Sequence, residues 1–258
     1  MSNDDHIYVR KFRPSDFPQV RNLLLEAFVT GKGSVASTVK LRYLYQAPAL
    51  TSYFLGAGGV YVLWILPAHY RTTPPAFAAL ALVVLSLVVF IALQMGLTKS
   101  VRGFCDKALA TDMRDIPKHY AAGVFFVAVQ PAATTAKLVE GAENLVDGEK
   151  AEQVLGFVGL EYQPDKNSKS AEVRRMVVGA KHRRRGLASR LMLEVLKHGE
   201  TIRGLQTIKL GVSQYQPAAR KLYEKLGWVR DGQTETWVGI INAYIARYSR
   251  PVKTKSNK

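Results

Sequence analysis

RRRGLA at residues 183–188 follows a β-rich run at 173–178 and opens a helical pattern of apolar residues at 191–196. This order predicts a strand, a loop and the N-terminus of a helix. The first backbone amides of a helix have no partner within the helix and lie at the positive end of its dipole. Gly186 and Ala188 would leave room for phosphate oxygens to approach these amides. The stretch therefore predicts a pyrophosphate site, and the alternative interpretation is a surface helix that begins with a basic cluster.

A second patterned segment lies downstream of this helix. QTIKLGV at residues 206–212 alternates like a strand, and QPAARKLYEKLGW at 216–228 has the pattern of a helix. Pro217 suits the first helical turn, and Gly227 suits the end of the helix. Together the two segments resemble the acetyl-CoA signature of the GCN5-related N-acetyltransferases, in which Arg-x-x-Gly-x-Ala is followed by a strand and by a helix with the pattern Asn-x-x-Ala-x-x-Leu-Tyr.

The resemblance implies an α/β fold with a mixed, mostly antiparallel, twisted sheet flanked by helices. The sheet would be splayed between the strands at 171–178 and 206–212, where acetyl-CoA wedges between them as the cosubstrate. No metal ion is implied. The expected contacts with acetyl-CoA are Met176, Val177, Val178, Arg183, Arg184, Arg185, Gly186, Leu187, Ala188, Ser189 and Gln216, the last of which stands where many members carry Asn.

Acetylation of an amine needs a polarised thioester carbonyl, a neutral amine and an acid for the departing thiolate. By resemblance, Tyr223 occupies the position whose phenol often protonates the thiolate of CoA, and its alternative role is that of a core aromatic residue. The nearest carboxylate to the cofactor loop is Glu172, a candidate general base whose alternative role is that of an ordinary exposed strand residue. His182 would titrate near neutral pH but is expected to be a surface histidine.

Two long uncharged segments precede these motifs. No formally charged side chain occurs in residues 44–70 or in residues 72–98. A membrane-spanning helix needs about 20 mostly apolar residues, so we expect a hairpin with spans at about 48–66 and 76–97. The alternative is a pair of core helices in a soluble domain. Small residues in the first segment would let the two helices approach closely.

Basic residues flank the hairpin on both sides. They are Lys32, Lys40 and Arg42 before it, and Lys99, Arg102 and Lys107 after it. The positive-inside rule then places the N-terminus and the catalytic domain in the cytosol. The first residues are polar and acidic and show no signal peptide. We therefore expect an integral membrane protein, in the endoplasmic reticulum if the source is eukaryotic.

The composition limits the classes of function. With 258 residues, the chain has room for one catalytic domain and extra elements. The net charge of +16 favours an anionic partner such as membrane lipid or the phosphates of CoA. Nucleic acid is not an expected partner, because no motif of aromatic and basic residues accompanies the charge. The single cysteine, Cys105, is expected to be a packed, inert thiol.

The order of the elements narrows the resemblance. A strand and helix at 7–28, the hairpin, and CDKALATDMRDI at 105–116 are together similar to the camello-like membrane N-acetyltransferases. This implies acetyl transfer to the amine of a small molecule, either an amino acid or a cysteine conjugate. The alternatives are a protein lysine acetyltransferase of the secretory pathway and a non-catalytic CoA-binding membrane protein. The expected divisions are 1–43 (first strand and helix), 44–98 (hairpin), 99–250 (acetyltransferase core) and 251–258 (basic tail).

Overall fold

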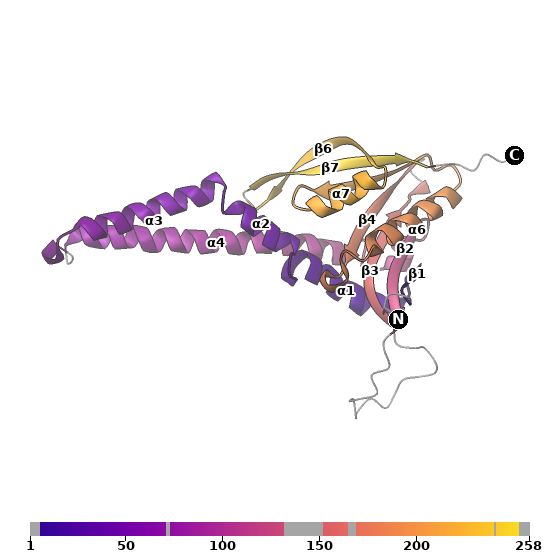
Figure 1. Cartoon of the computed structure of the whole chain (residues 1–258), viewed down its shortest axis with the longest axis horizontal. Coiled ribbons are helices and arrows are strands. Elements are labelled where there is room, and N and C mark those ends of the chain that lie inside the picture. The colour runs from indigo at the N-terminus through magenta and orange to yellow at the C-terminus, as the bar shows by residue number, and fades with distance from the viewer. Residues whose placement is uncertain (1–5, 71–72, 132–151, 165–168, 240, 253–258) are drawn as a thin grey trace, which may run out of the picture.

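The structure is a computed structural model that describes residues 6–70, 73–131, 152–164, 169–239 and 241–252. A globular α/β domain carries a long helical hairpin that projects from one side (Figure 1). Residues 253–258 of the predicted basic tail lie outside the described residues.

The domain is built on a seven-stranded sheet with the order β1-β2-β3-β4-β5-β7-β6. The strands are β1 (Tyr8–Lys11), β2 (Val124–Pro131), β3 (Glu152–Glu161), β4 (Ser170–Val178), β5 (Thr207–Ser213), β6 (Val229–Val238) and β7 (Ile241–Pro251). Within the described ranges, β4 and β5 form the one parallel pair, and the other neighbours are antiparallel. The predicted mixed, mostly antiparallel sheet is confirmed.

β4 and β5 pair over only part of their lengths. Residues 170–173 of β4 lie beside residues 207–210 of β5, and no pairing follows beyond them. A register shift between β3 and β4 accompanies this change, and Arg175 at the shift has a φ of 56°. Such a bulge bends a strand away from its neighbour. The sheet is therefore splayed between these two strands, as predicted.

Helices cover both faces of the sheet because its central strands are apolar on both sides. In β2, Val124, Phe126 and Ala128 face one core cluster, and the alternate residues face another. The first cluster lies under α6 (Leu187–Thr201) and α7 (Pro217–Lys225). The second lies under α1 (Phe17–Leu25), α5 (Ile116–His119) and the end of α4 (Pro74–Ala110).

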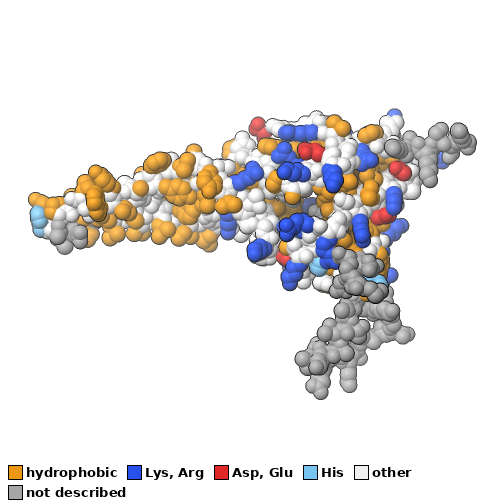
Figure 2. Space-filling view, viewed as in Figure 1, with side chains coloured by type: hydrophobic (Ala, Val, Ile, Leu, Met, Phe, Trp, Pro, Cys, Tyr) orange, Lys and Arg blue, Asp and Glu red, His pale blue; other side chains and the backbone are white. Residues whose placement is uncertain are grey.

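The hairpin consists of α3 (Ala47–Ile65) and α4, and both helices are long and apolar enough to cross a membrane. Their most apolar windows are only 17% and 11% buried. Hydrophobic side chains cover the hairpin along its length, whereas Lys and Arg gather on the domain (Figure 2). Two core helices of a soluble domain would be mostly buried, whereas these two windows are mostly exposed.

The last turns of α4 belong to the domain. α4 continues without a break from the hairpin to Ala110, and turns then lead to α5. Val101, Cys105 and Ala108 are buried at helical spacing, which fixes this end of α4 to the domain. Cys105 is fully buried, as expected, and burial raises the pKa of its thiol to about 11.

Candidate functional site

A pocket of about 410 Å³ lies where β4 and β5 diverge. β4 lines it from Glu172 to Met176, and β5 lines it from Leu210 to Ser213. Further walls come from α7, from α2 (Val35–Tyr43) and from the end of α4. The bulge in β4 therefore creates a cleft in the middle of an otherwise continuous sheet.

Tyr223 reaches this pocket from α7 and is almost fully buried. Its hydroxyl lies 3.8 Å from the sulfur of Met176 on β4, and its ring packs near Trp228 and Tyr248. Burial raises the pKa of the Tyr223 phenol above its ordinary value. The phenol is thus protonated at neutral pH, which is the form that can donate a proton.

Gln216 and Glu172 also line the pocket. Gln216 is the N-cap residue of α7, directly before Pro217 in the first helical position. Glu172 is 48% exposed, and its carboxylate accepts a hydrogen bond of 2.9 Å from Arg174. The structure therefore brings Met176, Gln216, Glu172 and Tyr223 to one cavity. A proton acceptor at Glu172 would be open to solvent.

The predicted pyrophosphate loop lies beyond the lining of this pocket, at the start of α6. Gly186 is the N-cap residue with a φ of 76°, a backbone conformation that favours glycine. A Cβ atom at Gly186 would meet nothing within 4 Å, so the space above the helix end is open. Leu187 is buried, and only its backbone can face a ligand there, next to Ala188 and Ser189.

The three arginines before Gly186 have different surroundings. The guanidinium of Arg183 donates hydrogen bonds to the carbonyl oxygens of Gly33 (3.2 Å) and Val178 (3.4 Å). Arg185 lies 3.1 Å from Nδ1 of His182, whereas Arg184 is exposed with a φ of 64°. Arg183 thus holds the loop to its neighbours, although it is exposed like Arg184.

His182 and the end of β4 complete this region. Burial lowers the pKa of His182, and the charges of Arg185 and Lys181 add to the effect. The side chains of Val177 and Val178 pack into the cores on opposite faces of the sheet. Any contact that these two valines make with acetyl-CoA is therefore expected from their backbone.

The sequence reasoning missed a buried ion pair under the bulge. Asp112 is 2% exposed and accepts hydrogen bonds of 2.7 Å from both Nε and Nη2 of Arg175. Tyr120 donates a further hydrogen bond of 2.9 Å, and the guanidinium carbon of Arg175 lies 5.1 Å from the ring centroid of Phe104. The pair fixes Arg175 in its left-handed conformation and so stabilises the bulge.

The charge of Asp112 is maintained by this partner. Burial alone would raise the pKa of Asp112, but the hydrogen bonds and charge of Arg175 outweigh it and hold that pKa below its ordinary value. An arginine in the middle of a β-rich run is a weak signal for such a pair. Its partner lies 63 residues away and could not be found by spacing.

The chain matches the family described as "Acetyltransferase (GNAT) family" over residues 112–228. These residues form a GNAT acetyltransferase domain. The chain is 27% identical to the N-acetylaspartate synthetase of Danio rerio, over 90% of this chain and 70% of that protein. It is 25% identical to the human N-acetyltransferase 8B, over 93% of each chain.

Among solved structures, an N-acetyltransferase from Staphylococcus aureus Mu50 aligns with a TM-score of 0.49 and 14% identity, over 96% of this chain and 100% of that one. The GNAT match and the named relatives agree with the resemblance to camello-like acetyltransferases. The domain is an acetyl-CoA-dependent N-acetyltransferase that binds acetyl-CoA and an amine acceptor. The roles of the individual residues stay predictions.

Proposed function

We propose that this protein is a membrane-anchored N-acetyltransferase that acetylates the amine of a small molecule bearing a carboxylate, either an amino acid or a cysteine conjugate. Relatives named N-acetylaspartate synthetase support an acidic acceptor. The observation that carries the proposal is the position of Arg175, which lines the pocket beside Tyr223.

Arg175 suits a carboxylate because its guanidinium is only partly used. A guanidinium has five N–H donors, and Asp112 accepts from Nε and Nη2. The remaining donors can bind one more carboxylate, and the ion pair with Asp112 holds them in place. An acceptor bound there would present its amine inside the cavity that also contains the hydroxyl of Tyr223.

The remaining pocket residues supply the other steps. Backbone groups of Met176, Val177 and Val178 would bind the pantetheine arm, and the amides at the start of α6 would bind the pyrophosphate. Glu172 would accept a proton from the amine as it attacks the thioester carbonyl. Tyr223 would donate its proton to the departing sulfur. In this scheme the amine loses one proton and the sulfur gains one, without a metal ion or a covalent enzyme intermediate.

The membrane anchor of the proposal is the hairpin of α3 and α4. Its exposed apolar surface and the basic residues on both flanks support an insertion with both termini in the cytosol. The proposed compartment is the endoplasmic reticulum if the source is eukaryotic. Carbonate extraction tests the anchor, and a glycosylation site engineered between His69 and Pro75 tests the lumenal position of the turn.

The test of the acceptor uses the full chain in vesicles with acetyl-CoA and a panel of amines. The panel contains L-aspartate, S-benzyl-L-cysteine, the α-carboxamide forms of both, and a lysine peptide, with release of CoA as the readout. We expect the carboxamides to lose about 10- to 100-fold in kcat/KM, since a hydrogen bond to a charged group is lost. Arg175→Gln should reduce the difference in kcat/KM between each acid and its carboxamide.

Other outcomes would replace the proposal. Faster turnover of the lysine peptide would favour a protein lysine acetyltransferase. A direct titration that shows binding of acetyl-CoA, without turnover of any amine, would favour a non-catalytic CoA-binding protein. Equal rates with S-benzyl-L-cysteine and its carboxamide, which has no carboxylate, would remove Arg175 from acceptor binding.

A further inference from the structure

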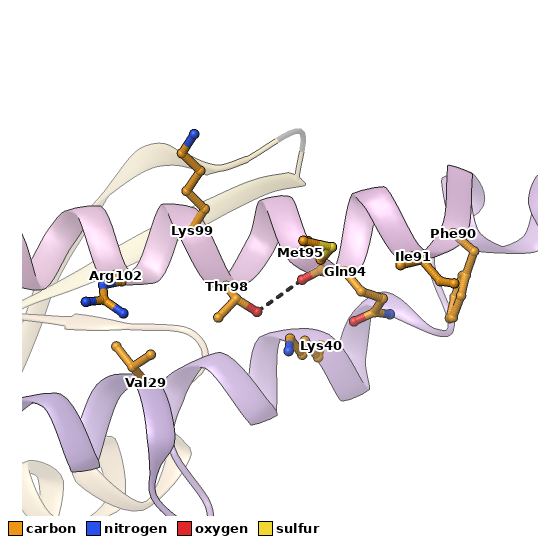
Figure 3. A pocket seen from close by; sticks show the side chains of 9 residues that line it. All are labelled: Val29, Lys40, Phe90, Ile91, Gln94, Met95, Thr98, Lys99 and Arg102. Carbon is orange, nitrogen blue, oxygen red and sulfur yellow. Dashed lines mark hydrogen bonds between the residues drawn. The ribbon is translucent and has the colours of Figure 1, made fainter. Parts of the chain in front are cut away.

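A groove of about 500 Å³ lies between α2 and α4, at the junction of the hairpin and the domain (Figure 3). It is separate from the pocket between β4 and β5, and the two cavities share no lining residue. Phe90, Gln94, Thr98 and Arg102 follow one another along one side of α4 in steps of four residues, which places them on one face of the helix. Lys40 faces them from α2.

The polarity of this groove changes steadily along α4. Phe90 and its neighbours Ile91 and Met95 make the end within the hairpin apolar, and Arg102 makes the end at the domain cationic. Between them, the hydroxyl of Thr98 donates to the carbonyl of Gln94 at 3.1 Å. Twelve residues of α-helix rise by about 18 Å. This length matches a lipid that runs from its phosphate to the middle of an acyl chain.

Two of the cations that line the groove are available for a ligand. Neither Lys40 nor Arg102 forms a salt bridge within the described part of the chain. Lys40 is half-buried and Arg102 is exposed, and both line the same groove. Lys99 also lines the groove, so three cations and no carboxylate border it, a composition that suits a phosphate group.

We propose that this groove binds one anionic membrane lipid, with its phosphate between Lys40 and Arg102 and an acyl chain along Phe90, Ile91 and Met95. The inference rests on the proposed membrane insertion of the hairpin. Charge complementarity selects an anionic headgroup over a zwitterionic one, and the apolar end selects a lipid over a soluble phosphate. α2 and α4 also line the acetyltransferase pocket, so the lipid would hold in place two of the helices that shape it.

The test compares the double variant Lys40→Gln/Arg102→Gln with the single variant Lys107→Gln. Lys107 is an exposed cation of the same helix that does not line the groove. The full chain is purified in detergent and titrated with phosphatidylglycerol or phosphatidylcholine of identical acyl chains, and bound lipid is counted by native mass spectrometry. We expect the parent to prefer phosphatidylglycerol by about tenfold or more, the double variant to lose this preference, and Lys107→Gln to stay within about twofold.

Three results would overturn the inference. They are equal binding of the two lipids by the parent, an equal loss in Lys107→Gln, and displacement of phosphatidylglycerol by millimolar inorganic phosphate alone. Carbonate extraction of the same variants separates this inference from the proposed anchor. Protein released by carbonate overturns the anchor and the lipid site together. Protein retained in the membrane without a preference for the anionic lipid overturns the lipid site alone.

Discussion

The two parts of α4 place their apolar side chains in different surroundings. In residues 98–110, Val101, Cys105 and Ala108 face inward and join the cores of the domain. In the preceding turns, large side chains such as Leu85 and Val88 face outward and are more than half exposed. One continuous helix therefore has one part that packs against the domain and another whose apolar side chains are exposed. The same helix ends two residues before Asp112, so the proposed anchor and the bulge in β4 are joined by one element.

The largest effect that would distinguish the domain from the hairpin is expected from Tyr223→Phe, which changes the domain alone. The variant keeps the buried ring but deletes the proton donor, so kcat should fall by about 10²- to 10⁴-fold. Affinity for acetyl-CoA and retention in the membrane should stay at parent values, because neither depends on the hydroxyl. Steady-state turnover and a binding titration measure the two quantities. Turnover at the parent rate, with chemistry shown to limit it, would make Tyr223 a packing residue.

The next largest effect is expected from Asp112→Asn, which should lower the free energy of unfolding of the domain. Arg175 would keep its burial but lose its counter-charge, and breaking a buried ion pair costs about 3–5 kcal/mol. The lower end is expected, because the side chain of Arg175 is 13% exposed. Urea unfolding of the full chain in detergent measures the loss. The matched control is Lys197→Gln in the exposed pair with Glu194, which should change the free energy of unfolding by less than about 1 kcal/mol.

An equal effect of the two substitutions would contradict the role assigned to the buried pair. Carbonate extraction of Asp112→Asn should still leave the protein in the membrane, because the hairpin does not use this pair. Release of the variant from the membrane would show that the anchor depends on the domain.

Gly186→Glu should weaken binding of acetyl-CoA by at least about tenfold, which is about 1.4 kcal/mol. The change places bulk and negative charge where the pyrophosphate is expected. Gly204→Glu is the matched control, because Gly204 also has a positive φ and open space around its Cβ. Both variants carry the same backbone strain, but only the first should lose affinity. Equal affinities in the two variants would remove Gly186 from the cofactor site.

The sequence predicted the local features of the domain better than its long-range contacts. The loop before Gly186 and the helix from Pro217 followed from adjacent residues, and the splay between β4 and β5 followed from the family resemblance. The pair of Asp112 and Arg175 did not, because a single sequence does not show which distant charges meet. The continuity of α4 was also missed, since the apolar run ends near Leu97 but the helix continues to Ala110.

The smallest effect on acetyl transfer is expected from Gly59→Ala, which tests the hairpin alone. A Cβ atom at Gly59 would lie 2.7 Å from the carbonyl oxygen of Ala79, so α3 and α4 must move apart to accept it. Overpacking of this kind costs about 1–3 kcal/mol.

Gly58→Ala is the matched control one residue away, because a Cβ atom there meets nothing within 4 Å. We expect Gly59→Ala to lower the thermal midpoint of helix loss in detergent and Gly58→Ala to leave it equal or higher, since alanine favours helix. Both variants should keep the parent kcat, because neither glycine lines the pocket between β4 and β5. A matching drop in kcat for Gly59→Ala would show that the packing of the hairpin reaches the active site through α4, and equal midpoints would show that α3 and α4 do not meet at this glycine.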